Sequence, residues 1–244
     1  MRTTFLLSVL LAGCGGGKPA PEKPLGAAEH LAEAQRHDRV AAEHQDQAVT
    51  LERQGAMPTV TCIDQPLAGV PYSGTEPIQV MRPCWRTDDI ETHEQAARLN
   101  IREAAEHRRA ARELRVAERQ ACAGMGEEEI AHGPFWHVDD IAVVDRIDEG
   151  GELRGARVVF LATSGLTPEW LERAIACEQA RAAVVGFDER TAPASPATLP
   201  HVKTEVRPVP GGIAVTLRSP DPVVAAAIYG RASYLLSGHA AHRN

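Results

Sequence analysis

The chain has 244 residues and a formal net charge of −7 at pH 7. This acidic balance argues against nucleic acid or an anionic lipid surface as a partner, because both repel a negatively charged protein. Seven of the ten aromatic residues fall between positions 135 and 234, so the core built from large side chains is predicted to be C-terminal.

The first residues of the chain combine a positive charge with a short apolar run. Arg2 precedes residues 5–11, FLLSVLL. This run is much shorter than the roughly 20 residues that span a bilayer and is typical of an export signal. The segment Leu11-Ala12-Gly13-Cys14 follows at once, and residues 1–17 resemble the lipobox signal of bacterial lipoproteins.

That resemblance implies a lipid anchor at Cys14. Residues 1–13 would be removed as a signal peptide, and Cys14 would carry a diacylglyceryl group and an N-acyl chain as the first mature residue. Buried methylenes contribute about 0.8 kcal/mol each, and two chains anchor a protein stably. Gly15, in place of Asp, favours the outer membrane of a diderm bacterium. We therefore expect a cell-envelope protein that faces the periplasm; the alternative is an ordinary secretory signal with an unmodified cysteine.

Two helices and a loop are predicted after the signal. Residues 14–26 are rich in Gly and Pro and predict a flexible, lipidated tether. Residues 27–126 predict an antiparallel helical hairpin, with helices over about 27–54 and 88–123 in Ala-, Glu-, Arg- and Gln-rich sequence. The loop between them, residues 55–87, contains many Pro and Gly residues and two cysteines.

Alanine and histidine recur every seven residues along both predicted helices, which is the spacing of a helix–helix seam. The expected pairing sets each histidine against an alanine, for example His44 against Ala97, because large and small side chains compensate in volume. The rows are Ala27, Ala34, Ala41 and Ala48 with His30, His37 and His44 in the first helix, and Ala97, Ala104 and Ala111 with His93, Asn100 and His107 in the second.

Three interpretations of these histidines remain open. The first makes them half-buried spacers that donate hydrogen bonds to glutamates or water. The second is a pH switch, since imidazoles with a pKa near 6.5 would charge together on acidification. The third is a site for a transition metal (Cu, Zn or Ni). Because successive histidines on one helix are roughly 10 Å apart, it would need a histidine from each helix, for example His44 with His93, or help from a neighbouring carboxylate, Glu29, Glu43 or Glu106. Its candidate ligands are His30, His37, His44, His93 and His107.

Besides Cys14, the chain has four cysteines, an even number that suits disulfide bonds in an oxidising compartment. Of the three possible pairings, we favour Cys62 with Cys84 and Cys122 with Cys177. The first would close the loop between the helices, and the second would tie the second helix to the C-terminal domain. A redox or thiolate zinc site is the weaker interpretation because no Cys-x-x-Cys is present.

Residues 135–238 predict an α+β sandwich made of two ββα units. Alternating apolar residues predict strands over 141–147 and 155–163, and again over 202–208 and 212–219, and each pair is followed by a helix that opens with proline. The expected fold is a four-stranded antiparallel sheet with two helices on one face. Residues 239–244 are predicted to be a frayed tail.

No catalytic motif was found, so the sequence predicts a binding or scaffold lipoprotein and not an enzyme. Its expected partners are the membrane, through the lipid, and another envelope protein or the cell wall. No cofactor is expected unless the histidines bind a transition metal, which makes periplasmic metal binding or sensing the alternative function. A small site near His132 and His137 is a more distant hypothesis.

Overall fold

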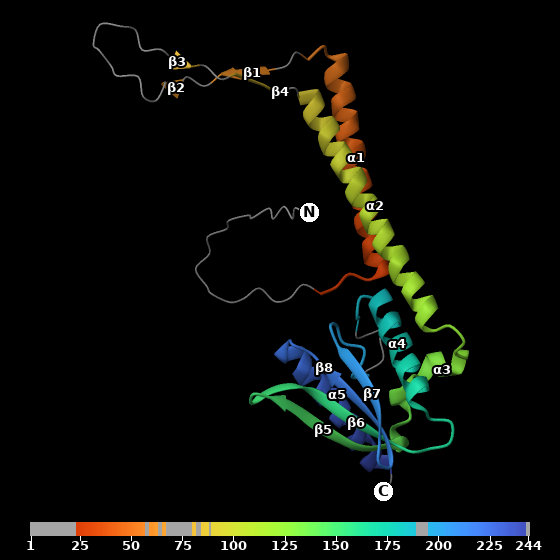
Figure 1. Cartoon of the computed structure of the whole chain (residues 1–244). Coiled ribbons are helices and arrows are strands. Elements are labelled where there is room, and N and C mark those ends of the chain that lie inside the picture. The colour runs from red at the N-terminus through yellow and green to blue at the C-terminus, as the bar shows by residue number, and fades with distance from the viewer. Residues whose placement is uncertain are drawn as a thin grey trace.

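The computed structural model describes residues 23–56, 59–62, 65–66, 80–81, 84–87, 89–188 and 195–242. Over these ranges the chain forms a long helical hairpin that stands at one end of a small α+β domain (Figure 1). The predicted signal peptide, Cys14 and most of the tether lie outside the described residues. Among the described helices, none combines the length and the apolar character that crossing a bilayer requires.

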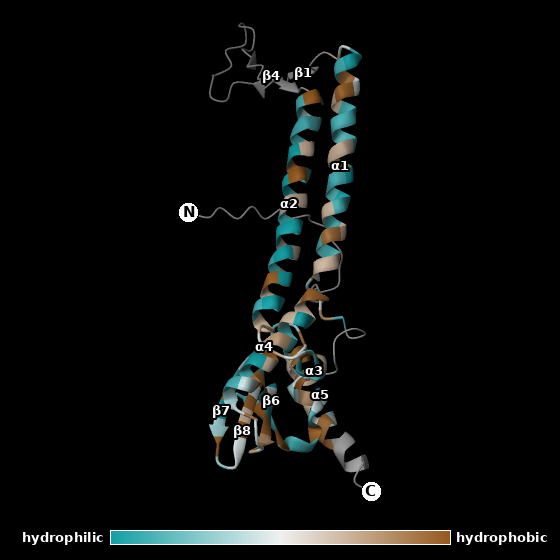
Figure 2. Cartoon of the chain, turned by 90° about the vertical axis from the view of Figure 1, so that its right-hand side faces the viewer, coloured by the Kyte–Doolittle hydropathy of each residue, from teal (hydrophilic) through white to brown (hydrophobic). Residues whose placement is uncertain are grey.

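The hairpin consists of α1 (Ala27–Arg53) and α2 (Asp89–Ala121). At 1.5 Å per residue these helices are about 40 and 50 Å long. At the start of α1, the Glu29 carboxylate accepts a hydrogen bond of 2.7 Å from the Gly26 N–H and so satisfies one of the free amides of the helix end. Figure 2 shows that most residues of the two helices are hydrophilic, as expected when only a narrow stripe of each helix is buried.

The described part of the chain between α1 and α2 contains four short strands, which lie at the end of the hairpin far from the domain (Figure 1). Strand β1 (Thr59–Cys62) pairs with β4 (Cys84–Thr87), and β2 (Gln65–Pro66) pairs with β3 (Val80–Met81). In this register Cys62 lies directly opposite Cys84. Directly opposed residues of antiparallel strands have Cα atoms about 4.5–5.5 Å apart, a spacing that a disulfide can bridge. The Cys62–Cys84 disulfide itself stays a prediction.

A short connection leads from α2 to the domain. It contains α3 (Glu127–His132) and two 3₁₀ turns, η1 (Pro134–Trp136) and η2 (Val138–Asp140). The Gly126 N–H donates to the Glu129 carboxylate over 2.7 Å and begins α3 in the same way that α1 begins.

The domain contains the predicted four-stranded antiparallel sheet. Its strands are β5 (Ile141–Glu149), β6 (Glu152–Leu161), β7 (Lys203–Val209) and β8 (Gly212–Arg218), in the order β5-β6-β8-β7. The β5–β6 turn is formed by Gly150 and Gly151, both with positive φ, which suits a two-residue hairpin turn. The two hairpins therefore join through their second strands, β6 and β8.

Helices α4 (Pro168–Val184) and α5 (Pro222–His242) each follow one hairpin, which confirms the predicted ββα order. The hydroxyl of Thr167 accepts from the Trp170 N–H and caps α4. Helix α5 continues beyond Gly238, where it was predicted to end. A single glycine costs a helix only about 1 kcal/mol relative to alanine, and the alanines at 240 and 241 favour helix, so the backbone continues.

Both helices cover the same face of the sheet, because buried residues of α4 and α5 share one core with alternate residues of β6 and β8. In register, Val158 lies opposite Val215 and Phe160 opposite Ile213. The largest fully buried side chains of this core are Phe160, Leu171, Ile175, Leu217 and Ile228.

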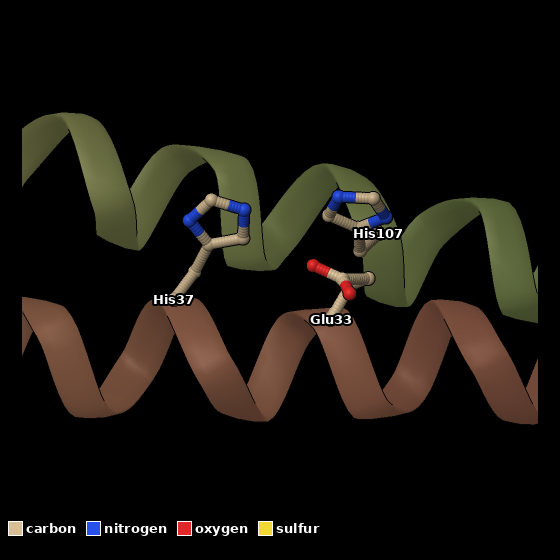
Figure 3. A group of neighbouring side chains, drawn as sticks. All are labelled: Glu33, His37 and His107. Carbon is tan, nitrogen blue, oxygen red and sulfur yellow. The ribbon is translucent and has the colours of Figure 1, made fainter.

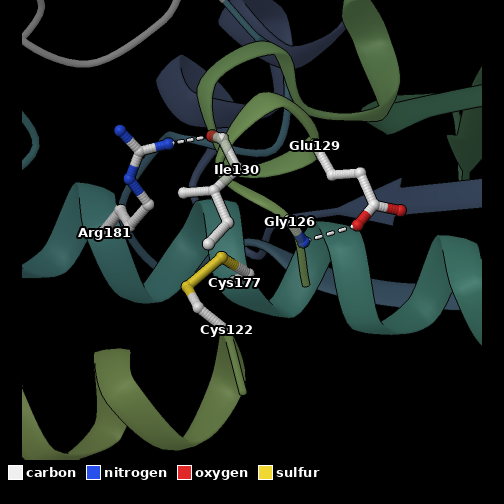
Figure 4. Close-up of a disulfide and its surroundings, with 6 residues drawn as sticks. All are labelled: Cys122, Gly126, Glu129, Ile130, Cys177 and Arg181. Atoms are coloured by element: carbon white, nitrogen blue, oxygen red, sulfur yellow. Dashed lines mark hydrogen bonds between the residues drawn. A yellow bond between two sulfur atoms is a disulfide. The ribbon is translucent and has the colours of Figure 1, made fainter. Parts of the chain in front are cut away.

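The hairpin is fixed to the domain at the base of both helices. Cys122, just after α2, forms a disulfide with Cys177 of α4, with the Cα atoms 4.7 Å apart; this is one of the two pairings favoured from sequence. Figure 4 shows this bond beside Arg181, whose guanidinium donates to the Ile130 carbonyl. At the base of α1, a Cβ on Gly26 would lie 2.5 Å from the Gly186 nitrogen, so only glycine permits this backbone contact.

Candidate functional site

The alanine rows of α1 and α2 form the buried stripe of the hairpin. Ala104 is completely buried, and small side chains allow two helices to approach closely. The other members of the rows are buried as well, each at most 6% exposed: Ala27, Ala34, Ala41, Ala48, Ala97 and Ala111.

The histidine rows face each other, and the predicted pairing of histidine with alanine was wrong. Nδ1 of His30 lies 2.9 Å from Nδ1 of His107, and Nδ1 of His44 lies 2.9 Å from Nδ1 of His93. The rings gain hydrogen-bond partners in this register, whereas an alanine could offer a ring nitrogen nothing. The alanines form a separate buried stripe, in which only methyl groups pack between the helices.

Between these two pairs, His37 of α1 meets the polar residues Asn100 and Glu103 of α2. Its Nδ1 lies 2.9 Å from Asn100 Oδ1 and 3.0 Å from Glu103 Oε2. The Asn100 amide nitrogen donates to the Ala96 carbonyl, which turns Oδ1 toward His37. Because both neighbours are acceptors, the ring proton belongs on Nδ1, and Nε2 keeps its lone pair in the neutral ring.

Glu33 joins His37 and His107 in the one metal-ligand cluster that the described residues contain (Figure 3). One ligand atom from each side chain lies within 4.8 Å of the others, and all three residues are half-buried. Glu33 was not among the ligands predicted from the sequence. Its position four residues before His37 was the available signal, because residues at i and i+4 share one helix face.

The carboxylate of Glu33 is held by Arg36, one turn along α1. The Arg36 Nε donates to Glu33 Oε2 over 2.7 Å, and its Nη2 lies 2.6 Å from the same oxygen. This hydrogen bond is the main cause that lowers the pKa of Glu33 below its ordinary value. The carboxylate is therefore ionised at neutral pH.

The environment of His30 disfavours a second proton in its pair with His107. Burial lowers the pKa of His30, and the charge of His107 lowers it further, against the opposing effect of Glu29. In the tautomer in which Nδ1 of His107 donates to His30, Nε2 of His107 is the lone-pair nitrogen.

The cluster borders an open groove of about 500 Å³ between the helices. Two imidazoles and a carboxylate are nitrogen and oxygen donors of the kind that Zn(II), Cu(II) and Ni(II) accept. Two further carboxylates, Glu103 and Glu106, line this groove. Its other lining residues are His30, His37, His107 and Ala110.

His44 and His93, the pair named from sequence as an example of chelation across the hairpin, contact each other with ring centroids 5.2 Å apart. Within the described parts of the chain, no third ligand-type side chain completes a cluster with them. Of the five predicted histidines, the structure thus groups His37 and His107 with a carboxylate, places His30 beside His107, and leaves His44 and His93 as a pair.

The second region considered from sequence, near His137, borders a groove of about 300 Å³ that also contains Asp140 and Trp170. His132 is engaged elsewhere: its ring packs 4.8 Å from that of Trp136, and its Nδ1 donates to the Glu128 carbonyl. The groove therefore receives only one of the two histidines.

Comparisons with models of protein families, with curated proteins and with solved structures found no match.

Proposed function

We propose that the chain is a lipid-anchored protein of the cell envelope that faces the periplasm and acts by binding, not by catalysis. The export signal and the lipobox-like segment that ends at Cys14 support the anchor. The binding partner would be another envelope protein or the cell wall. In this proposal the hairpin is a rigid spacer between two binding regions, the α+β domain and the chain that joins α1 to α2.

The observation that carries this proposal is the double attachment of the hairpin to the domain. The Cys122–Cys177 disulfide ties α2 to α4. The contact between Gly26 and Gly186 sets the base of α1 against the C-terminal end of α4. Two attachments through separate helices oppose bending at the junction. A helix pair about 40 Å long then keeps its far end at a defined distance from the domain.

The tether would join this body at the base of α1. If residues 14–26 form the flexible tether that their composition predicts, these 13 residues have a root-mean-square length of roughly 20 Å. The lipid would therefore hold the junction of hairpin and domain near the membrane, with the far end of the hairpin roughly 40 Å from that junction.

The spacer can be tested by shortening it without changing its seam. Deleting residues 38–44 together with residues 93–99 removes one heptad from each helix and one histidine pair, about 10 Å of length. We expect this variant to fold, to stay in the envelope and to lose partners cross-linked through the far end in intact cells. The matched control keeps the full-length hairpin and replaces residues 1–14 with an ordinary cleavable secretory signal, which should move the protein from the membrane to the soluble periplasmic fraction.

Two results would contradict the proposal. If the shortened and the full-length hairpin cross-link to the same partners, the spacer role is contradicted. Membrane fractionation that persists after residues 1–14 are replaced by a cleavable secretory signal would contradict the lipid anchor.

A further inference from the structure

We infer that Glu33, His37 and His107 form a binding site for a divalent transition-metal ion, a site that the spacer role does not require. Glu33 and His37 present two donors from one face of α1, and His107 adds a third from α2. An ion bound there would join the two helices. Figure 3 shows the Glu33 carboxylate rising from α1 toward the His107 ring, with the His37 ring beside it between the helices.

The distances require only side-chain adjustment. Ligand atoms around a tetrahedral Zn(II), at about 2.0–2.2 Å from the ion, are roughly 3.4 Å apart from one another. The three ligand atoms of the cluster lie within 4.8 Å of one another. Side-chain rotations that move these atoms by about 1 Å would bring them to a common ion. The rings of His37 and His107 are stacked, with centroids 5.6 Å apart and planes 18° apart, so the two imidazoles already lie side by side between the helices.

Outer-shell partners select the coordinating nitrogen of His37 and suit the same choice at His107. Asn100 and Glu103 accept from Nδ1 of His37, which leaves its Nε2 as a lone pair available to an ion. Nδ1 of His107 lies 2.9 Å from Nδ1 of His30, and in the tautomer in which His107 donates, its Nε2 is a lone pair as well. Metal-binding histidines in proteins are oriented in this way, with the second ring nitrogen donating to a carboxylate, carbonyl or other acceptor.

The charges of the groove favour a cation. Arg36 keeps Glu33 ionised and contacts one of its oxygens, Oε2. Glu103 and Glu106 line the same groove. Three carboxylates therefore lie beside the two imidazoles, and their negative charge attracts a divalent ion.

The donor set selects the class of ion. Imidazole nitrogen with one carboxylate suits Zn(II), Cu(II) and Ni(II), and the general affinity order places Cu(II) first. Three protein ligands leave a fourth position for water, because the groove is open to solvent. Hard ions such as Ca(II) and Mg(II) prefer oxygen ligands and should bind poorly.

The test is a titration of the full chain carrying Cys14→Ser with Cu(II), Zn(II), Ni(II) and Mg(II), read by calorimetry and, for Cu(II), by the nitrogen couplings in electron paramagnetic resonance. We expect one equivalent of Cu(II) or Zn(II) with a dissociation constant below about 1 µM and two coupled imidazoles. His37→Gln, His107→Gln and Glu33→Gln should each weaken binding. For the histidine variants the loss should exceed the roughly 10- to 100-fold that removal of an outer-shell partner costs.

His44→Gln and His93→Gln are the matched controls, since they remove a ring of the same seam that has no third ligand beside it. They should leave the affinity unchanged within about 2-fold, whereas Asn100→Ala should weaken it by about 10-fold. Circular dichroism of each variant separates lost binding from lost helix. The proposal is overturned if the parent chain binds no ion more tightly than about 1 µM, or if the His44 and His93 variants lose as much affinity as those of His37 and His107. Either outcome would leave the spacer role of the hairpin in place.

Discussion

Nδ1 of His30 lies 2.9 Å from Nδ1 of His107, so the two rings share a single proton between these nitrogens. One ring must donate and the other accept. If both rings were protonated on both nitrogens, two N–H groups and two positive charges would face each other across the seam. His44 and His93 repeat this arrangement at the next histidine pair along the hairpin.

Acid should therefore weaken the hairpin. Because the pKa of His30 is lowered in the folded chain, the unfolded chain takes up a proton more readily once the pH falls below about 6.5, the ordinary value. The contribution of His30 to the free energy of unfolding is then fully present above that pH. It is lost as the pH falls toward the folded-state pKa. We expect a lower midpoint of thermal unfolding, followed by circular dichroism at 222 nm, at pH 5 than at pH 7.5.

The control for this prediction is a double variant, His30→Gln with His107→Gln, which keeps polar side chains of similar length but cannot gain charge. It should show a smaller difference in midpoint between pH 5 and pH 7.5. An equal difference in parent and variant would mean that this pair does not sense acid.

Glu178 of α4 should give the domain the opposite response to pH. Its side chain is buried, and burial raises its pKa to about 7, although a hydrogen bond from Ser195 over 2.9 Å favours the ionised form. Between about pH 4.5 and 7 the unfolded chain has released this proton while the folded chain retains it. The free energy of unfolding therefore falls as the pH rises through this window.

Glu178→Gln removes that titration and keeps an acceptor for the Ser195 hydroxyl. We expect it to stabilise the domain at pH 8 by on the order of 1–3 kcal/mol and to change little at pH 5, measured by urea unfolding followed by tryptophan fluorescence. If Glu178→Gln destabilises the domain equally at both pH values, the carboxylate is needed for packing. The account in which burial of its charge lowers the free energy of unfolding would then be contradicted.

Ala104 shows how closely the two helices pack, since it has no exposed surface. Ala104→Leu inserts three carbon atoms into the seam and should lower the free energy of unfolding by about 1–3 kcal/mol through overpacking. The neighbouring Ala105 is exposed, so Ala105→Leu is a matched control that should stay within about 0.5 kcal/mol of the parent. Equal effects of the two substitutions would contradict the close seam.

The Cys122–Cys177 disulfide closes a loop with a sequence separation of 55 residues. In the chain-entropy description, a loop of this length contributes up to about 4 kcal/mol to stability. The double variant Cys122→Ala with Cys177→Ala should lower the unfolding midpoint and increase the motion of the hairpin relative to the domain. Distances between spin labels on α1 and α5 would measure that motion, and an unchanged distance distribution would contradict the role of the disulfide in holding the junction rigid.

The sequence was sufficient for features that depend on local periodicity. The alanine row repeats every seven residues, and all seven of its members named from sequence are buried. Thr167 and Pro168 predicted the start of α4 because a cap and a proline at the first helical position act within one turn. The order of the two ββα units followed from similar local signals.

The register of the hairpin could not be predicted, because two seams with the same seven-residue period can align in more than one way. Volume compensation favoured His44 against Ala97, whereas the structure pairs His44 with His93. The deciding term was hydrogen bonding between partly buried polar groups, which depends on distances across the pair of helices. Glu33 was overlooked for the same reason, since only the true register places it beside His107.

The most direct measurement of the proposed role is the mass of the amino-terminal peptide of the protein isolated from the envelope of the cells that produce it. A lipid-anchored spacer predicts a chain that begins at Cys14 and carries a diacylglyceryl group on its sulfur. An unmodified peptide that begins at Met1 would contradict the anchor, and with it the envelope location and the tethered hairpin.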